Sequence, residues 1–501
     1  MNRALASATI IAALGGLLFG FDTAVISGTT DALRDVFDLD SSFLGFQGFW
    51  LGFTVASALI GTIVGAMTAG LPADRLGRRS TLILIAVLYF VSAIGSALAW
   101  DWYSFIVFRF IGGLGVGGAS VVSPMYIAEI SPARLRGRLV AVTQFNICFG
   151  IMAAYFSNAA VAACDLGPYE WRWMFAVEAV PAAAFFLLLW LTPRSPRWLI
   201  SQGFTDEARD VLAIVGTDSD SVSEEVQAIQ VSLDLAHHSM REPFFRRKYL
   251  RPILLAVAIA AFNQLSGINA VLYYAPHVFK MAGASEASSL LQSSAIGFTV
   301  MIFTMIALTL IDHLGRKTLM IIGSLGYIAS LGATAWAFYA YDVEFKAAMD
   351  SHNAVIQARA SLATATGAEA VSNAEAALSA ATDHADVTTA SLGYGGVIIL
   401  ASLLLFIAAH AFGQGTVIWV FISEIFPNRV RARGQALGSF THWFMAAVIS
   451  QTFPMMADKS GGNAFAFYCA MMVLQLLWVL WIMPETRGIP LEQIQKKLGI
   501  E

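Results

Sequence analysis

Charged side chains are scarce in this sequence of 501 residues. Asp, Glu, Lys and Arg together make up 13% of it and hydrophobic residues 57%, whereas about a quarter of a soluble protein is charged. This shortage excludes an ordinary water-soluble domain and predicts a protein with many membrane spans. The net charge of −4 is mild and argues against a nucleic-acid partner.

Cysteines and catalytic motifs are also scarce. The three cysteines, Cys148, Cys164 and Cys469, are widely spaced, so we expect buried thiols and no metal site. The chain has no nucleophile elbow and no phosphate-binding glycine loop, which argues against a membrane enzyme. The glycines of "GGLGVGG" at 112–118 lie in an apolar run, where small residues favour helix packing. We find no cleavable signal and expect the first span to direct insertion.

Long apolar runs are abundant instead. Runs of roughly 20 mostly apolar residues are long enough to cross a bilayer as helices. We therefore expect an all-α membrane protein with 12 transmembrane helices, near 8–28, 46–70, 80–100, 103–124, 139–162, 172–192, 252–275, 290–311, 317–340, 393–421, 435–455 and 464–483.

The basic residues predict the orientation of these spans. With both termini in the cytoplasm, most of the 30 Lys and Arg residues fall in cytoplasmic segments, as the positive-inside rule requires. We therefore expect an integral membrane protein with both termini cytoplasmic.

The sequence also repeats itself. "DRLGRRS" at 74–80 returns as "DHLGRKT" at 312–318, "EISPARLRGR" at 129–138 as "EIFPNRVRARG" at 424–434, and "TPRSPRWL" at 192–199 as "MPETRGIPL" at 483–491. The distance between paired motifs grows in the second half, which indicates an insertion. We place it at 341–391, a segment rich in Ala, Ser and Thr that forms either a short helical pair or a mobile loop outside the cell.

Two related halves of six spans predict a transporter. The substrate then binds between the halves near the middle of the membrane, and rocking of the halves gives alternating access. We expect an N-terminal half at 1–192, a cytoplasmic linker of short helices at 193–251, a C-terminal half at 252–484 and a cytoplasmic tail at 485–501.

Amide side chains interrupt the seventh span, "FNQLSGINAVLYYAP" at 262–276. Asn263, Gln264 and Asn269 are costly in hydrocarbon unless they have partners. On a straight helix, Gln264 and Asn269 would point about 140° apart. One ligand can meet both only if the helix unwinds locally or the ligand wraps its edge, and Gly267 is where we expect a break. Hydrogen bonding between helices is the alternative role of these amides.

Asp22 and Arg109 are the only opposite charges that we place deep in first-half spans. Each is costly there alone, and pairing lowers the cost. Separation of the pair would favour proton binding to Asp22, and reunion with Arg109 would favour proton release. A static ion pair is the alternative.

These motifs resemble the sugar porter family of the major facilitator superfamily. The resemblance covers nearly the whole chain except 341–391. It rests on "GGLLFGFDTAVISG" at 15–28, "DRLGRR", "SPMYIAEISPARLRGR" at 123–138, "QLSGINAVLYYAP" at 264–276, "DHLGRK", "WVFISEIFP" at 419–427 and "PETRG" at 484–488, in this order.

The resemblance implies the major facilitator fold and import of a monosaccharide, a hexose or a pentose, by proton symport. An uncoupled facilitative sugar uniporter is the alternative, and a sugar sensor is a rival class. The resemblance to bacterial symporters also implies the bacterial inner membrane. We expect a functional monomer in the lipid bilayer, with sugar and protons as partners and no cofactor.

The resemblance also implies roles for single residues. The proton-coupling pair of the symporters matches Asp22 and Arg109. Sugar-binding positions match Gln144, Asn263, Gln264, Asn269, Tyr273, Tyr274, Trp419, Trp443 and Phe19. The cytoplasmic gate, for which a solvated charge run is the alternative, matches Arg78, Arg79, Glu129, Arg136, Arg316, Glu424 and Arg431.

Six positions depart from the family pattern. Asn263 stands where many members have a second Gln. His442 replaces a polar amide of some members, Ile151 replaces a Gln, and Ala446 stands where several members have Asn. Thr416 occupies the position of a proline before the tryptophan of the tenth span. Arg194 replaces an acid after the sixth span, so we expect a weaker or rewired gate in the first half.

Overall fold

The computed structural model describes residues 2–132, 134–215, 222–239, 243–427, 429–457, 460–487, 489, 493–494, 496 and 498–500, with side chains in these ranges except at 233–239 and 312. Parts of the expected linker and tail thus lie outside the described residues. Within the described ranges, an isolated bridge between Phe43 and Phe46 is the only β-pairing. The expected all-α fold is confirmed.

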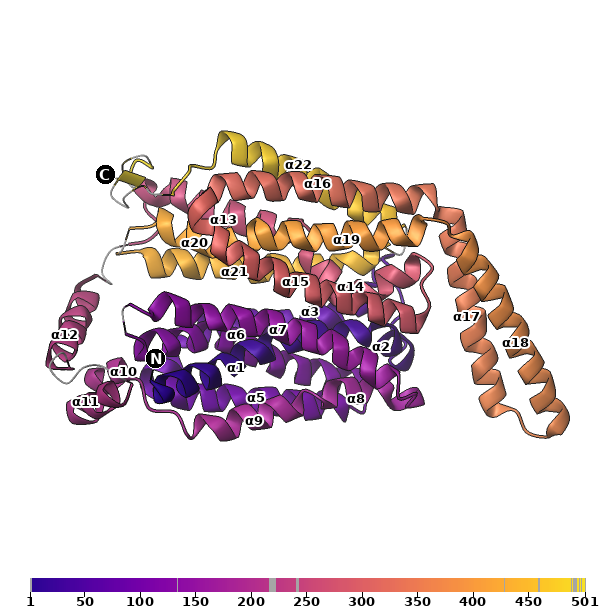
Figure 1. Ribbon diagram of the computed structural model, residues 1–501, viewed down its shortest axis with the longest axis horizontal. Coiled ribbons are helices and arrows are strands. Elements are labelled where there is room, and N and C mark those ends of the chain that lie inside the picture. Colours follow the sequence, from indigo (N-terminus) through magenta and orange to yellow (C-terminus); the bar gives the residue numbers. More distant parts are fainter. Residues whose placement is uncertain are drawn as a thin grey trace.

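The first half of the chain forms one layer of helices, drawn in indigo to magenta (Figure 1). Its elements are α1 (Arg3–Val25), η1 (Ile26–Gly28), α2 (Thr30–Val36), α3 (Phe49–Thr68), α4 (Gly70–Arg75), α5 (Arg78–Ala97), α6 (Trp102–Ile130), α7 (Arg136–Ala162), η2 (Gly167–Tyr169), α8 (Glu170–Ala176) and α9 (Ala179–Leu189).

The second half forms the other layer, drawn in pink to yellow (Figure 1). Its elements are η3 (Arg247–Tyr249), α13 (Leu250–Leu265), α14 (Ile268–Met281), α15 (Glu286–Leu314), α16 (Arg316–Ala340), α19 (Gly395–Phe412), α20 (Gln414–Ile425), α21 (Arg431–Ala457) and α22 (Gly461–Trp481).

Two groups of helices lie at opposite ends of this bundle (Figure 1). The linker helices, α10 (Pro196–Ser201), α11 (Thr205–Ile214) and α12 (Val222–Ser239), lie beside the start of α1, and we call this the linker end. The helices α17 (Asp342–Thr364) and α18 (Ala368–Ser391) project from the opposite end, which we call the hairpin end. The two layers pack through α3 against α21 and α7 against α15.

Eleven helical segments of the described chain are long and apolar enough to cross a membrane. The remaining expected span, near 435–455, lies in α21, a helix of 27 residues. Polar side chains such as His442, Gln451 and Thr452 make α21 less apolar than the others, yet it packs along α3 and α13 as a full member of the bundle.

The glycines of 112–118 bring α6 against α3. A Cβ atom at Gly113 would lie 1.9 Å from the Ala58 carbonyl oxygen, and one at Gly117 would lie 2.2 Å from that of Thr62. Any larger residue would force the two helices apart, so these glycines serve helix packing, as predicted.

The insertion at 341–391 is a helical hairpin, which was one of the two expected forms. Its base is part of the core, because Phe345, Ala348 and Ser351 are buried. The Phe345 ring lies 5.6 Å from the Phe338 ring, and His352 Nε2 lies 3.2 Å from the Gly283 carbonyl oxygen. The base of the insertion is therefore packed against the helix bundle.

We predict that the tip and the base of the hairpin respond differently to mutation. Replacing 353–384 by a short Gly/Ser turn should leave the thermal stability of the purified protein nearly unchanged, because the packed base remains. Phe345→Ala should destabilise it by about 3 kcal/mol, as loss of a buried aromatic ring does. Equal melting temperatures for Phe345→Ala and wild type would contradict the structural role of the base.

Candidate functional site

The seventh span is broken at the predicted residue. The helix α13 ends at Leu265 and α14 begins at Ile268. Between them, Gly267 has a φ of 84° and a ψ of 13°, a left-handed conformation that disfavours any side chain. A Cβ atom there would also lie 2.5 Å from the Tyr468 ring. Both the dihedral angles and the close contact therefore require glycine.

The break brings the three amides of this span together. Asn269 Nδ2 donates to Gln264 Oε1 at 2.9 Å, and Gln264 Nε2 donates to Asn263 Oδ1 at 2.9 Å. All three side chains are buried. The angular separation expected on a straight helix is thus removed, and the amides satisfy part of one another's hydrogen-bonding capacity.

Aromatic rings from α21 and α20 lie beside these amides. Gln264 Nε2 lies 3.3 Å from both ring nitrogens of His442. Equal distances of this length fit only a position over the face of the imidazole, so its edge is not occupied by Gln264. The His442 ring lies 5.2 Å from that of Trp419 and 5.0 Å from that of Trp443. The Trp443 ring in turn lies 5.6 Å from that of Phe19, which joins the two halves.

Gln144 lies apart from the amide group. It is half-buried on α7, and its Nε2 lies 3.8 Å from Cys148 Sγ. Ile151, two turns farther along α7, is buried and apolar. The structure therefore does not bring Gln144 into hydrogen-bond contact with Gln264 or Asn269.

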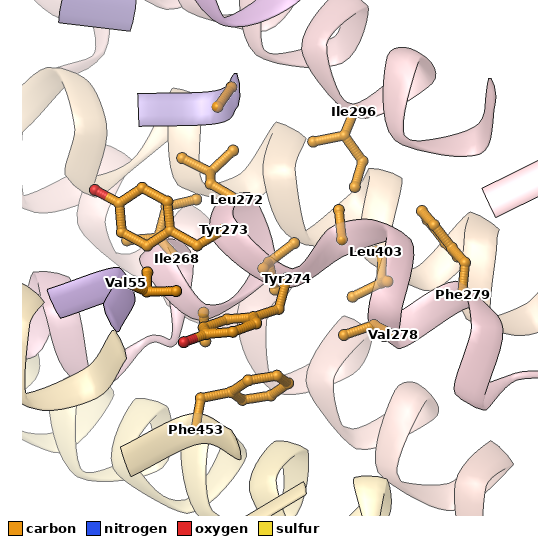
Figure 2. Packing of buried hydrophobic residues seen from close by; sticks show 14 of the residues in the cluster. Val55, Ile268, Leu272, Tyr273, Tyr274, Val278, Phe279, Ile296, Leu403 and Phe453 are labelled. Carbon is orange, nitrogen blue, oxygen red and sulfur yellow. The ribbon is translucent and has the colours of Figure 1, made fainter. Parts of the chain in front are cut away.

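The paired tyrosines of α14 contact different neighbours (Figure 2). Tyr274 lies over Phe453, with ring centroids 5.1 Å apart, and its hydroxyl donates to the Ser450 carbonyl at 3.0 Å. Tyr273 lies on the other side of α14, near Val55 (Figure 2). Tyr274 thus fastens α14 to α21, whereas Tyr273 faces the first half.

A small cavity of about 10 Å³ lies where the halves meet, which is room for about one water molecule. Its lining includes residues from both halves, among them Asp22, Val55, Thr62, Arg109, Tyr273 and Trp443.

Asp22 and Arg109 form the predicted ion pair. Arg109 Nη1 lies 2.6 Å from Asp22 Oδ1, and Nη2 lies 3.4 Å from Oδ2. Both side chains are nearly inaccessible, at 3% for Asp22 and 2% for Arg109. The guanidinium also lies 5.4 Å from the Phe175 ring centroid. The pair therefore joins α1 to α6 in the interior of the first half.

Our expectation that this pair stands alone is wrong. Glu178, in the turn between α8 and α9, is 1% exposed and interacts electrostatically with both Asp22 and Arg109. Neither of its carboxyl oxygens has a hydrogen-bond partner among the described residues. The signal was present in the sequence, as an acid inside the apolar run "FAVEAVPAAAFF". Only the packing of α9 against α1 and α5 brings it to the pair.

The two halves are held together at the hairpin end. Asp31 of α2 lies 3.0 Å from His277 Nδ1 and 2.9 Å from Lys280 Nζ, both on α14. Burial raises the pKa of Asp31, but the charges of Lys280 and His277 outweigh burial and lower it overall. Gln451 Nε2 donates to the Phe49 carbonyl at 2.8 Å. These contacts close the gap between the halves at this end.

At the linker end, the described ion pairs stay within one half, and the two halves repeat the same arrangement. Glu129 binds Arg78 Nε at 2.9 Å and the Ser195 hydroxyl at 2.5 Å. Glu424 binds Arg316 Nη2 at 2.9 Å and the Thr486 hydroxyl at 2.6 Å. The repeated sequence motifs thus correspond to repeated contacts.

The departure at Arg194 breaks this symmetry. In the second half, Glu485 accepts from the backbone N–H groups of Arg316 and Lys317 at 3.0 Å, at the start of α16. Burial raises the pKa of Glu485, but its backbone hydrogen bonds outweigh burial and lower it overall. In the first half, Arg194 instead pairs with Glu207 of α11 at 3.6 Å. The start of α5 thus lacks the carboxylate cap of its counterpart.

The other predicted gate residues bind backbone carbonyls. Arg79 donates to Leu189 and Trp190, and the remaining contacts are Arg136 Nε to Ala128 O at 3.0 Å and Arg431 Nε to Phe426 O at 3.4 Å.

The tenth span also breaks, without a proline. Gly413, with φ −93° and ψ −99°, separates α19 from α20. The Thr416 hydroxyl donates to the Ala411 carbonyl at 2.6 Å across the break. A glycine and a threonine thus produce the bend at the position where the family has proline.

Comparisons with known proteins show the relationship of the chain. It matches the family described as "Sugar (and other) transporter" over residues 8–358 and 373–498. It is 37% identical over 520 residues to the D-xylose-proton symporter of Escherichia coli (strain K12), covering 98% of this chain and 94% of the relative.

Solved structures of one protein give a further comparison. The inward open conformation of the xylose transporter XylE from E. coli has a TM-score of 0.79 and 35% identity, covering 98% of this chain and 99% of that chain. XylE bound to 6-bromo-6-deoxy-D-glucose has a TM-score of 0.72 and 35% identity, covering 99% of both chains. The present fold is thus more similar to the inward open form.

We predict that Gly267→Ala destabilises the protein. The left-handed conformation alone should cost about 1–2 kcal/mol, and the contact with the Tyr468 ring adds to it. Gly137→Ala is the matched control, since a Cβ atom there meets nothing within 4 Å and alanine favours the helix. Thermal unfolding of both purified variants should show a loss only for Gly267→Ala, and equal midpoints would contradict the requirement for glycine.

Proposed function

The chain belongs to the sugar transporter family of the major facilitator superfamily, and from this premise we propose that it imports a monosaccharide together with protons. It is an integral membrane protein and a transporter rather than an enzyme. The observation that carries the proposal is the buried group of Asp22, Arg109 and Glu178. Asp22 and Arg109 of this group line a cavity that Tyr273 and Trp443 of the other half also line.

The amides and aromatic rings support a sugar substrate. Gln264 and Asn269 offer donors and acceptors for hydroxyl groups, and Trp419 and Trp443 offer flat faces for the apolar side of a sugar ring. His442 contributes its ring nitrogens, which lie beside Gln264. The names of the relatives include xylose and a glucose derivative, so we propose a pentose or a hexose.

Asp22 is proposed as the proton carrier and Arg109 as its switch. While the pair is closed, the guanidinium neutralises the carboxylate. Movement of α1 relative to α6 would remove that stabilisation and favour proton binding from the side that is then open. Glu178 is proposed as a third member. As a buried carboxyl without a hydrogen-bond partner, it would be costly as an anion, so a proton held there neutralises the group in the described state.

We further propose that the hairpin end faces outward and the linker end faces the cytoplasm of a bacterial cell. The external mouth is then the end closed by Asp31, His277 and Lys280. In this orientation the described state faces inward, which agrees with the higher similarity to inward open XylE.

The organisation of the chain follows the same proposal. The halves at 1–192 and 252–484, with the linker at 193–251 and the tail at 485–501, would rock as two bodies within one monomer in the bilayer. The ion pairs of Glu129 and Glu424 with Arg78 and Arg316 would brace the helix ends of each half. Arg136 and Arg431, which bind backbone carbonyls in the described state, would bind across the halves when the linker end closes.

We predict that Gln264→Ala and Asn269→Ala weaken sugar binding without preventing folding. Each lost hydrogen bond to a neutral hydroxyl should cost about 1 kcal/mol, or roughly fivefold in Kd. Binding of xylose and glucose to the purified variants, measured by calorimetry, checks this. Gln144→Ala should be measured alongside these two variants, because Gln144 lies apart from the amide group. Wild-type affinity in both Gln264→Ala and Asn269→Ala would exclude this site.

We predict that Asp22→Asn abolishes sugar accumulation but retains exchange of sugar for sugar, since the amides lie on other helices. The variant should also lose about 3–5 kcal/mol of stability, because Arg109 is left as an unpaired buried charge. Glu178→Gln should be much less destabilising, because the amide resembles the protonated acid. The decisive measurement is external alkalinisation of weakly buffered cells on sugar addition, present in wild type and absent in Asp22→Asn. A wild type that equilibrates sugar without moving protons would be a facilitative uniporter.

A further inference from the structure

A stripe of hydroxyl groups runs along one face of α5. Tyr89, Ser92 and Ser96 are spaced at i, i+3 and i+7, which places them on the same side of a helix. Their exposed fractions are 0%, 1% and 0%, and none of the three hydroxyls has a hydrogen-bond partner among the described residues. Buried polar groups are nearly always paired, with ordered water where protein atoms are absent. Three such groups in a row therefore indicate a site that takes water.

Several other buried serines are bonded within their own helices, although Ser123 and Ser450 also lack a hydrogen-bond partner among the described residues. Ser57 donates to the Thr54 carbonyl at 2.7 Å, and Ser324 donates to the Met320 carbonyl at 2.7 Å. A helical serine ordinarily satisfies its hydroxyl in this way, by bonding to the preceding turn. Ser92 and Ser96 do not, so their hydroxyls are available to partners outside α5.

The absence of a side chain at Gly112 lets Ser92 lie close to the ion pair. A Cβ atom built at Gly112 would lie 2.3 Å from Ser92 Oγ and 3.4 Å from Asp22 Oδ1. Ser92 Oγ thus fills the place that a side chain at Gly112 would need, and both oxygens lie close to the same point beside Gly112. Tyr89 lies one turn away, 3.5 Å from the corresponding point at Gly115, and interacts electrostatically with Asp22 and Glu178.

The stripe leads toward the hairpin end. Ser96 is the penultimate residue of α5, and Leu98, two residues beyond it, is 69% exposed. From Tyr89 to Ser96 the stripe spans about 10 Å along the helix. None of the three residues lines the cavity between the halves, whereas Asp22 and Arg109 do. The acid therefore faces the inter-half cavity on one side and the stripe on the other.

We propose that Tyr89, Ser92 and Ser96, with water between them, form a proton path inside the first half, from the hairpin end to Asp22 and Glu178. The path is separate from the sugar route between the halves. The proposed proton path rests on the proposed symport and adds the place at which the proton enters the protein. A proton passes from external water to the first hydroxyl as that hydroxyl gives its own proton onward, and the last transfer ends on a carboxylate, so no bond other than O–H forms or breaks.

Arg109 keeps the path from joining the inter-half cavity in the described state. Its guanidinium is bonded to Asp22, which borders both the cavity and the stripe, and neutralises the carboxylate in place of a proton. When the pair separates, the path supplies the proton that Asp22 takes up. Proton entry then does not require passage through the bound sugar, and this is the functional consequence of the separate path.

The test compares proton and sugar movement in proteoliposomes that contain a pH-sensitive dye. The variants are Ser92→Ala, Ser96→Ala and their combination, with Ser57→Ala as a matched buried serine whose hydroxyl is bonded within its own helix. We expect sugar-driven proton uptake and sugar accumulation to slow on the order of tenfold in the combined variant, as loss of about one hydrogen bond in a transfer step implies. Exchange of labelled for unlabelled sugar, which needs no net proton movement, should stay at the wild-type rate.

Ser92→Thr restores the hydroxyl and should recover most of the proton uptake, which a purely structural role in packing would not explain. Proton uptake within twofold of wild type in the combined variant would overturn the path while leaving symport intact. Equal loss of exchange and proton uptake would also overturn it, because the serines would then act on the fold or the sugar site. A wild type that moves no protons would remove the proposed symport, and the path with it.

Discussion

The cost of burying charge in the membrane interior organises the first half of this protein. Arg109 cannot lose its proton and is almost fully enclosed, so a carboxylate must lie against it. Asp22 fills that need with two contacts. The pair fixes α1 against α6 and forms part of the cavity that Tyr273 and Trp443 complete from the other half. Structure and proposed coupling thus depend on the same interaction.

Glu178 makes the group more than a simple ion pair. Two acids and one guanidinium carry an uneven charge, and a buried excess charge is unfavourable. One proton balances the group. In the proposed mechanism the group holds one proton while Asp22 and Arg109 are paired and takes up a second when they separate, so it can carry a proton. The hydroxyl stripe of α5 lies on the side of this group that faces away from the sugar route.

Breaks in helices organise the second half. Gly267 and Gly413 interrupt the seventh and tenth spans, and each break frees polar groups inside the bundle. At Gly267 the freed side chains are amides that bond one another and lie against His442. These amides can give up hydrogen bonds to one another and form hydrogen bonds to sugar hydroxyls instead, at little cost in free energy. Irregular backbone at membrane depth is tolerated where it lines a cavity.

Many of these features could be predicted because a polar or charged group buried in the membrane is costly in free energy. Length and apolar composition predicted the spans, and the repeated motifs predicted the two halves. The cost of lone charges predicted the contact between Asp22 and Arg109. The 140° separation of Gln264 and Asn269 predicted a break, and the only glycine between them predicted its position. Each of these follows from local chemistry, which a single segment of sequence displays.

Tertiary structure decided the rest, because partners distant in sequence depend on how helices pack. Glu178 was visible as an acid, but only the position of α9 makes it a neighbour of Asp22. The same holds for Gln264 with His442, for Asp31 with Lys280, and for Arg194 with Glu207. The separation of Gln144 from the amides also depends on the relative position of the halves. Sequence alone determined which residues need partners in the membrane, and packing determined which partners they have, because a hydrogen bond requires atoms within about 3 Å and no single segment fixes that distance.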